Sequence, residues 1–193
     1  RSMAETSVRR PIDPITLALS GVLRRSSQTT VDRAAVSTPE SIAFPTTGDR
    51  TAYALYYPPT NPSATAPDDE LPPLVVRSHG GPTANASSGL SIEIQLLTSR
   101  GVAVVDVDYG GSTGYGRAYR DRLLTRWGLL DIDDCVTGAL SLALAGRVDP
   151  TRLAIRGGSA GGYAVLRAMT TSRAFAAGTS LFGVADLAAL AAE

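Results

Sequence analysis

A serine set among glycines, where an apolar run meets a helical pattern, is the part of this sequence best suited to chemistry. The run Leu153–Ile155 leads into the glycine-rich turn Gly157–Gly162, and an alanine-rich helical pattern follows. This is the G-x-S-x-G arrangement of a nucleophile elbow, in which a tight strand-to-helix turn exposes the serine hydroxyl. Glycine is needed at Gly157 and Gly161, because side chains there would collide with the neighbouring strand and helix. We therefore expect Ser159 to be a nucleophile; the alternative is a tight turn without chemistry.

A second glycine-rich turn could stabilise the negative charge that such a reaction develops. His79-Gly80-Gly81-Pro82 follows the short β-branched run Leu74–Arg77 and precedes a helical pattern. In an α/β hydrolase one oxyanion donor is the backbone N–H after the nucleophile, here Ala160. The other comes from the loop after an earlier strand, which matches Gly81. Each donor contributes about 3 kcal/mol of transition-state stabilisation. His79 and Gly80 are expected to support this loop.

The elements that must position these two turns alternate along the chain. A strand–helix alternation from residue 74 onward, preceded by a hairpin, predicts a mostly parallel α/β sheet flanked by helices. We expect strands over residues 41–45, 51–57, 74–77, 102–107, 153–155 and 177–183, helices over 88–100, 129–145, 163–170 and 185–193, a surface loop over 58–73 and a glycine-rich loop over 108–117.

Composition indicates one globular domain and excludes several kinds of partner. The chain has 193 residues, 44% of them hydrophobic, a net charge of zero and scattered arginines, which argues against nucleic acid or a membrane as partner. No apolar run approaches the roughly 18 residues of a membrane span. The lone Cys135 permits neither an internal disulfide nor a cysteine metal cluster, and we expect a buried, inert thiol. No cofactor is expected.

Three aspartates open the helical pattern over residues 129–145. Asp131, Asp133 and Asp134 could form a metal site, but no other hard oxygen ligands cluster nearby in the sequence. The favoured interpretation is that their negative charge complements the dipole of the helix N-terminus. No metal is therefore expected.

Four blocks of sequence, in this order, resemble the prolyl oligopeptidase family of serine peptidases and are most similar to its acylaminoacyl-peptidase and dipeptidyl-aminopeptidase branch. The blocks are His79–Pro82, Tyr109–Gly116, Trp127-Gly128 with Asp131 and Asp134, and Gly157–Tyr163. The resemblance covers residues 40–193 and implies an α/β-hydrolase fold acting on short peptides. Ser159 would be the nucleophile, and the N–H groups of Gly81 and Ala160 the oxyanion donors.

The resemblance also implies how the chain is divided. Residues 1–38 would be the exit from a β-propeller that precedes the catalytic domain, and residues 39–193 a partial hydrolase domain lacking its last strands. The strand over 177–183 would then be an edge with exposed apolar surface. On this interpretation the sequence is a C-terminally truncated part of a longer peptidase. The cytoplasm is the expected location, because no export signal is recognisable.

The sequence departs from the family pattern in the groups that would activate the serine. A serine nucleophile needs a base and a carboxylate that orients it, and in this fold they follow in the order Ser, Asp, His. The one histidine, His79, lies in the oxyanion loop, and Asp186 comes too early to be the triad carboxylate. Glu193 and Asp106 offer no better substitute. We therefore expect this chain alone to be inactive unless the missing Asp and His are supplied.

Two other functions stay open at this point. A carboxylesterase of the same fold would usually carry a third glycine where Pro82 stands and would lack the Tyr109–Gly116 block. An inactive truncated paralogue that binds peptides or a partner would account for the absent histidine. The sequence does not specify side-chain preference, exo- or endopeptidase action, or oligomeric state.

Overall fold

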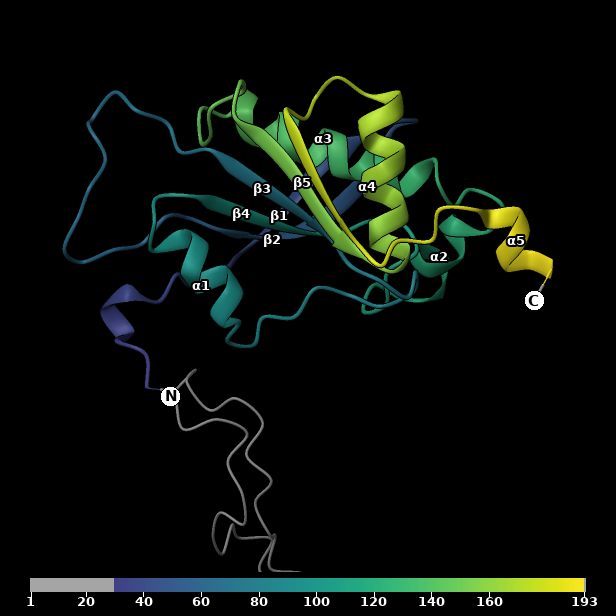
Figure 1. Cartoon of the computed structure of the whole chain (residues 1–193), viewed down its shortest axis with the longest axis horizontal. Helices are drawn as coiled ribbons and strands as arrows, with labels where there is room; N and C mark the ends of the chain where they lie inside the picture. Colours follow the sequence, from purple (N-terminus) through teal and green to yellow (C-terminus); the bar gives the residue numbers. More distant parts are fainter. Residues whose placement is uncertain (1–29, 193) are drawn as a thin grey trace, which may run out of the picture.

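A twisted six-stranded sheet forms the centre of the computed structural model, which describes residues 30–192, with side chains to residue 189 (Figure 1). The spatial order is β1-β2-β4-β3-β5-β6. The first two pairings are antiparallel and the other three are parallel. The predicted mostly parallel sheet is therefore confirmed. Its strands are β1 (Glu40–Thr46), β2 (Arg50–Tyr57), β3 (Leu74–Ser78), β4 (Ala103–Asp108), β5 (Leu153–Gly158) and β6 (Ala177–Leu181).

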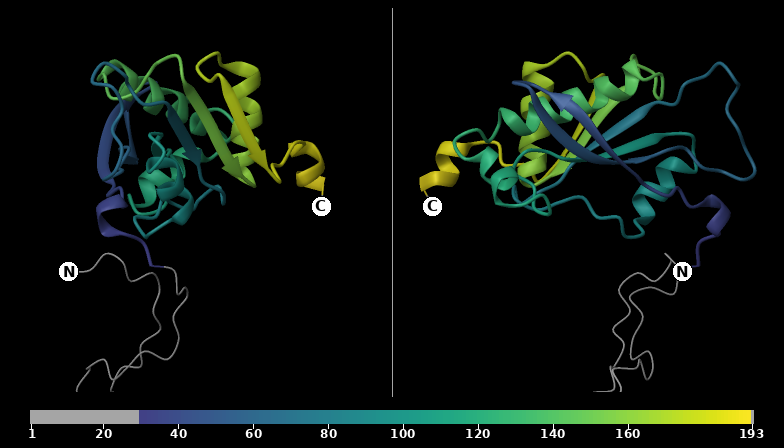
Figure 2. Two further views of the ribbon diagram at one scale, coloured as in Figure 1. Left: turned by 60° about the vertical axis from the view of Figure 1, so that its left-hand side comes forward. Right: turned by 180° about the vertical axis from the view of Figure 1, so that it is seen from behind.

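Helices cover both faces of this sheet (Figures 1 and 2). α3 and α4 pack on one face, against β3 and other strands, and α1 packs on the opposite face against β4. Across residues 30–192, each helix is too short or too polar to span a bilayer. The helices are α1 (Ile92–Thr98), α2 (Arg117–Arg120), α3 (Leu130–Leu144), α4 (Ala160–Thr171) and α5 (Leu187–Ala192), with 3-10 turns η1 (Arg33–Ala35) and η2 (Asp121–Leu123).

The alternation of side chains along β4 explains why the sheet is covered on both faces. Val105 and Val107 belong to the large core cluster beneath α3 and α4, whereas Val104 packs with Ile94 of α1 and with Tyr57. All residues of β4 are buried, as expected for a strand enclosed on both faces. Each fully buried aliphatic side chain contributes about 1.5–3 kcal/mol to the stability of the fold. The valines of β4 therefore stabilise the packing of α1 on one face of the sheet and of α3 and α4 on the other.

Most expected elements are present, and the differences lie at their ends. α1 is shorter than the predicted 88–100 because Ser91 caps it, its hydroxyl accepting the N–H of Ile94. α4 begins at Ala160, before the predicted residue 163, because its two early glycines are held by tertiary contacts despite their low helix propensity. The short α2 and η2, over residues 117–123, were not predicted.

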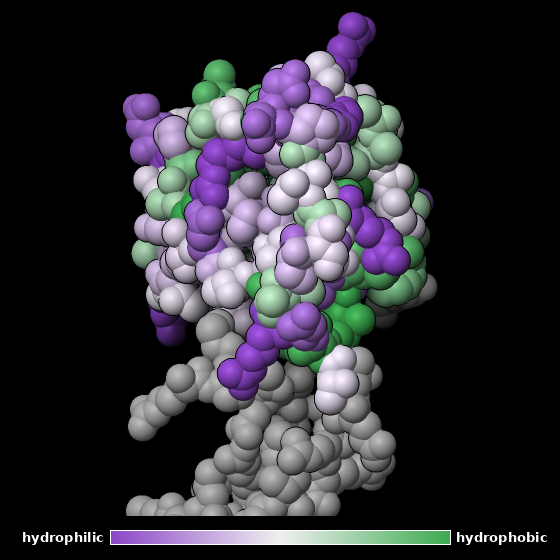
Figure 3. All heavy atoms as spheres, turned by 90° about the vertical axis from the view of Figure 1, so that its left-hand side faces the viewer, coloured by the Kyte–Doolittle hydropathy of each residue, from purple (hydrophilic) through white to green (hydrophobic). Residues whose placement is uncertain are grey.

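Residues 58–73 form the expected loop, without helix or strand. The end of the molecule that carries this loop shows hydrophilic and hydrophobic residues side by side (Figure 3). Cys135 is buried, as predicted. The expected boundary after residue 38 stays a prediction, because residues 1–29 lie outside the described part of the chain.

The aspartates at the start of α3 have a larger role than the helix-dipole interpretation gave them. Asp134 is buried and accepts hydrogen bonds from the N–H of Gly110 (2.7 Å) and the hydroxyl of Thr46 (2.6 Å). Asp131 is also buried and accepts the N–H of Gly128 at 2.8 Å. Burial raises the pKa of Asp131 to about 6 and also raises that of Asp134. These carboxylates anchor irregular backbone to α3, which the dipole interpretation missed.

Replacing Asp134 by alanine should therefore destabilise the fold. The change leaves the buried N–H of Gly110 and the Thr46 hydroxyl without their acceptor, at a cost of about 1–3 kcal/mol each. Chemical denaturation would measure the loss. Asp133→Ala is the matched control, because Asp133 makes an exposed hydrogen bond with Thr47 (3.1 Å). Equal losses in the two variants would contradict the assigned role of Asp134.

Candidate active site

Ser159 lies at the turn between β5 and α4, where the parallel strands end. Its backbone angles are φ 55° and ψ −122°, in a region that residues with a side chain rarely adopt. Its N–H donates to the carbonyl oxygen of Leu181 in β6 at 3.0 Å. A strained serine at the junction of strand and helix is the geometry of a nucleophile elbow.

The glycines around Ser159 are required by contacts between backbones. A Cβ atom at Gly157 would overlap the carbonyl oxygen of Gly161, and one at Gly161 would overlap the carbonyl oxygen of Ser78 in β3. A Cβ atom at Gly162 would lie 2.6 Å from the Cα of Gly183, beyond β6. The first turn of α4 therefore presses directly against the ends of β3 and β6.

The loop that follows β3 passes beside the serine. A Cβ atom at Gly80 would lie 3.2 Å from the carbonyl oxygen of Gly158 and 3.5 Å from the Cβ of Ser159. Gly81 has φ 124°, a backbone conformation that favours glycine. Among the described residues, neither the N–H of Gly81 nor that of Ala160 meets a hydrogen-bond acceptor. Both N–H groups are thus free to bind another group.

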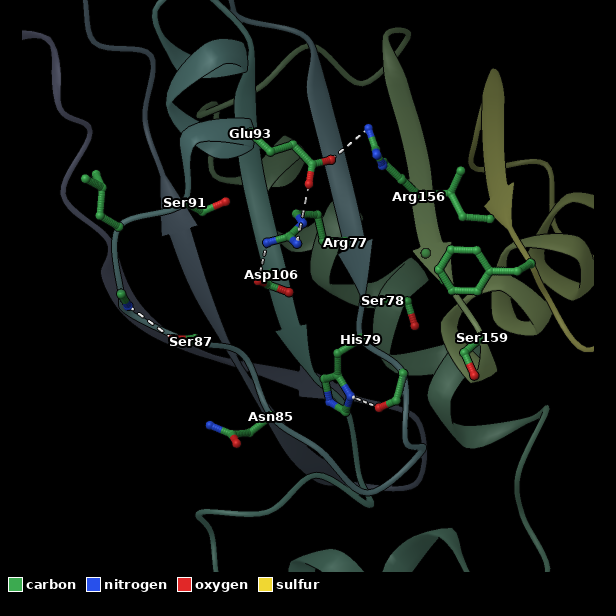
Figure 4. Close-up of a pocket in the computed structure, with 17 residues that line it drawn as sticks. Arg77, Ser78, His79, Asn85, Ser87, Ser91, Glu93, Asp106, Arg156 and Ser159 are labelled. Atoms are coloured by element: carbon green, nitrogen blue, oxygen red, sulfur yellow. Dashed lines mark hydrogen bonds and ion pairs between the residues drawn. The ribbon is translucent and has the colours of Figure 1, made fainter. Parts of the chain in front are cut away.

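A cavity of about 600 Å³ opens next to these two turns. His79, Gly80, Gly157 and Ser159 contribute to its wall, whereas Gly81 and Ala160 do not. His79 and Ser159 lie toward one end of the cavity, and a group of charged side chains lies toward the other (Figure 4).

The charged side chains pair with one another. Arg77 bonds Asp106 at 2.8 Å and Arg156 approaches Glu93 at 2.7 Å. Burial raises the pKa of Asp106 to about 6, although the Arg77 guanidinium opposes this rise. Two cations and two carboxylates leave this end of the cavity without excess charge.

His79 is fully occupied by groups other than Ser159. Its Nδ1 lies 2.8 Å from the carbonyl oxygen of Gly80, and its Nε2 lies 2.7 Å from the hydroxyl of Ser112. The ring stacks on Tyr109, with 4.3 Å between the ring centroids. Burial lowers the pKa of His79 and favours the neutral ring. The contacts of His79 are those of a structural residue, not of a base for Ser159.

Asp186 is no better placed as a triad carboxylate. It is exposed and accepts the N–H groups of Ala188 (2.9 Å) and Ala189 (3.1 Å) at the start of α5. The same carboxylate oxygen accepts both hydrogen bonds, so Asp186 acts as the cap of α5.

Phe182 is a neighbour of the site that sequence reasoning missed. It is 82% exposed, has φ 40° and helps to line the cavity. A Cβ atom at Gly158 would lie 3.0 Å from its ring. The only sequence signal was its place at the end of an expected strand, which does not specify where the side chain points.

Comparisons with known proteins agree with this geometry. Residues 88–193 match the Prolyl oligopeptidase family. The chain belongs to this family. It is 38% identical over 116 residues to dipeptidyl aminopeptidase BIII of Pseudoxanthomonas mexicana, covering 60% of this chain and 17% of that protein. It is 33% identical over 110 residues to the acylamino-acid-releasing enzyme of Rattus norvegicus, covering 57% of this chain and 14% of the enzyme.

Solved structures of similar proteins extend the likeness over more of the chain. A puromycin-hydrolyzing peptidase of Mycobacterium tuberculosis is 48% identical with a TM-score of 0.88, over 94% of this chain and 28% of the other. The acylaminoacyl peptidase of Pyrococcus horikoshii is 33% identical with a TM-score of 0.68, over 76% of this chain and 23% of the peptidase. The expected family and its α/β-hydrolase fold are confirmed, and this chain spans less than a third of each relative's length.

Replacing Gly161 by alanine tests the backbone contact that forms the elbow. The added methyl group would meet the carbonyl oxygen of Ser78, so we expect a loss of about 3 kcal/mol or more in unfolding free energy. Gly89→Ala is the control, because Gly89 is exposed and a Cβ atom added there would meet only the side-chain oxygen of Ser87, at 3.3 Å. It should stay within about 0.5 kcal/mol of the parent. A tolerated Gly161→Ala would show that the elbow is looser than described.

The buried Asp106 should make the stability depend on pH. A carboxyl whose pKa is raised in the folded state, here from 3.8 to about 6, binds a proton more tightly when folded. Its contribution to stability is therefore gained as the pH falls from about 6 to about 4, and lost as the pH rises again. Asp106→Asn should remove this contribution, as measured by urea unfolding of both proteins across that window. An unchanged pH dependence would contradict the assignment.

Proposed function

We propose that this chain carries the nucleophile and the oxyanion donors of a serine peptidase that cleaves short peptides. The observation that carries the proposal is the strained backbone of Ser159 at the start of α4, with the loop after β3 so close that a Cβ atom added at Gly80 would lie 3.5 Å from the Cβ of Ser159. The cavity reaches Ser159, and the residues on either side of the Gly80–Gly81 and Ser159–Ala160 peptides leave both N–H groups without an acceptor among the described residues. Membership of the prolyl oligopeptidase family supports peptide bonds as the bonds attacked.

The reaction follows from the positions of these groups. The Ser159 oxygen attacks the carbonyl carbon of the scissile amide while a base takes its proton, and the carbonyl π electrons move to oxygen. The N–H groups of Gly81 and Ala160 donate to that oxyanion, and the N-terminus of α4 adds favourable dipole potential. The carbonyl re-forms as the C–N bond breaks, and the departing amine takes up the proton. Water then attacks the acyl-serine and releases the acid.

We propose that the base required by this reaction is not His79 and is not among the groups that surround Ser159 in this chain. The single histidine of the sequence, His79, has both ring nitrogens engaged and no hydrogen bond to Ser159. Loss of the histidine of such a triad costs about 10⁶ in turnover. We therefore propose that an Asp and a His supplied from elsewhere complete the site.

The similar proteins support a peptide substrate. The relatives named above are a dipeptidyl aminopeptidase and an acylamino-acid-releasing enzyme, and a puromycin hydrolase 43% identical to this chain was solved in complex with PGG. The cavity beside Ser159, about 600 Å³ in volume, has room for a side chain or a short peptide segment next to the reacting carbonyl.

The test is to assay the native gene product, with its intact mass determined, on aminoacyl anilides and on p-nitrophenyl esters. We expect anilide cleavage that falls by about 10⁶ in Ser159→Ala, to the background left by the oxyanion hole and binding. Ser63→Ala, in the exposed 58–73 loop, is the matched control and should retain activity.

Four outcomes would contradict parts of the proposal. Ester cleavage without anilide cleavage would indicate a carboxylesterase. Full peptide cleavage by Ser159→Ala would exclude Ser159 as the nucleophile. Peptide cleavage by the 193-residue chain alone, lost in Ser159→Ala, would show that the base lies within it after all. A native product that never cleaves either substrate would support a binding function.

A further inference from the structure

The glycine-rich loop after β4 lies against the turn that follows β3, although the reaction above gives it no role. Tyr109 is buried, and its hydroxyl lies 2.8 Å from the carbonyl oxygen of Pro82 and 3.1 Å from that of His79. Ser112 has no exposed surface, and its N–H donates to the carbonyl oxygen of Tyr109 at 2.9 Å. The hydroxyl groups of Tyr109 and Ser112, both in the loop after β4, therefore contact the turn after β3.

Two contacts of His79 Nδ1 indicate the position of the ring proton. Nδ1 lies 2.8 Å from the carbonyl oxygen of Gly80 and 3.2 Å from the hydroxyl oxygen of Tyr109, which donates its own proton to the carbonyl of Pro82. A carbonyl oxygen can only accept, so the 2.8 Å contact with Gly80 places the proton on Nδ1. The neutral ring then has an unprotonated Nε2, which accepts from the hydroxyl of Ser112 at 2.7 Å. Because Ser112 is fully buried, no solvent replaces its hydroxyl as donor. A serine hydroxyl can donate or accept, so the Gly80 carbonyl decides the tautomer, and Ser112 stabilises it by donating to the unprotonated Nε2.

The tautomer determines where a backbone N–H points. The carbonyl of Gly80 and the N–H of Gly81 belong to one planar trans peptide, so they point in opposite directions. The hydrogen bond from His79 Nδ1 fixes the carbonyl, and with it the direction of the N–H. That peptide lies beside Ser159, and the Gly81 N–H meets no acceptor among the described residues.

We propose that Ser112, assisted by Tyr109, is a positioning residue that holds His79 in the Nδ1–H tautomer, and that His79 thereby aims the Gly81 N–H at the carbonyl oxygen attacked by Ser159. The direction assigned to the Gly81 N–H rests on the proposed function, whereas the tautomer of His79 depends on contacts within this chain alone. The Tyr109–Gly116 block is thus the support of the oxyanion turn.

The tautomer is directly observable, because the sequence contains a single histidine. In the ¹⁵N-histidine-labelled chain we expect one imidazole with a protonated Nδ1 and an unprotonated Nε2 near neutral pH. Ser112→Ala should shift population toward the Nε2–H tautomer, and Ser112→Thr, which keeps a hydroxyl, should preserve the original signals. Ser87→Ala is the control, because Ser87 lines the same cavity without a hydrogen bond to His79. An unchanged tautomer in Ser112→Ala would overturn the proposal.

A second variant keeps the test decisive if Ser112→Ala fails to fold. Tyr109→Phe keeps the ring stacked on His79 but removes the hydroxyl that contacts Pro82 and the His79 carbonyl. We expect exchange broadening of the imidazole signals in this variant, because the turn is less firmly held. Sharp signals identical to those of the parent would contradict the part assigned to Tyr109.

Kinetics of the native gene product test the aim of the N–H. Removing an oxyanion donor costs about 10²–10³ in kcat, and a misdirected donor should cost less, so we expect Ser112→Ala to lower kcat by about tenfold to a hundredfold with KM little changed. Ser112→Thr should restore kcat. A rise in KM alone, or an unchanged kcat, would overturn the aiming role.

Failure of this inference and failure of the proposed function give different results. Ser159→Ala should abolish peptide cleavage and leave the His79 tautomer as it was. If no Ser159-dependent cleavage exists, the proposed function fails while the tautomer shift in Ser112→Ala can still be present. If cleavage exists and Ser112→Ala changes neither the tautomer nor kcat, only the inference fails.

Discussion

The close contact between the first turn of α4 and the end of β3 is the constraint on which the candidate site depends. At Gly161 the helix backbone approaches the carbonyl oxygen of Ser78 so closely that no side chain fits. This approach forces the chain to reverse within one residue, and Ser159 takes the strained conformation that results. The loops after β3 and β6 then lie on either side of the serine, since parallel strands end at the same edge of the sheet.

Buried carboxylates hold the irregular segments that surround this edge. Asp131 and Asp134 accept backbone N–H groups from loops, and Asp108 accepts the N–H of Ala86 (2.6 Å) and the hydroxyl of Tyr115 (2.8 Å). Each carboxylate accepts a backbone N–H that would be bonded to a carbonyl oxygen in a helix or a sheet. Burial removes water from these carboxylates, which is unfavourable and raises the pKa of Asp131 and Asp134. Their hydrogen bonds fix the geometry of the loops.

The order of the elements could be predicted from the sequence because each has a local signal. The mostly apolar run over residues 102–107 predicted the strand that became β4, and the glycines around Ser159 predicted a tight turn. The elbow and the loop of His79 were found for the same reason, since each is a contiguous motif. The short α2 carried no such pattern and was missed.

The contacts across the site could not be predicted in this way. Ser112 contacts His79 from a different loop, 33 residues further along the chain. Arg156 of β5 pairs with Glu93 of α1. Nothing in either local sequence marks its partner, because the pairing depends on how far each strand extends and which way its last side chains point. Asp131 and Asp134 were marked by the helix start and by the motif blocks, but neither signal showed that Asp134 accepts the N–H of Gly110 or that Asp131 accepts the N–H of Gly128.

The hydrogen bond from the Ser159 N–H to Leu181 links the turn after β5 to the neighbouring strand β6. β6 is the last strand in the order, pairs only with β5 in the described part of the chain, and is largely exposed. Opening of β6 would remove the carbonyl of Leu181 that holds the Ser159 N–H, and the serine could then relax from its strained conformation. The conformation of Ser159 therefore depends on the position of β6 as well as on the glycine contacts at the start of α4.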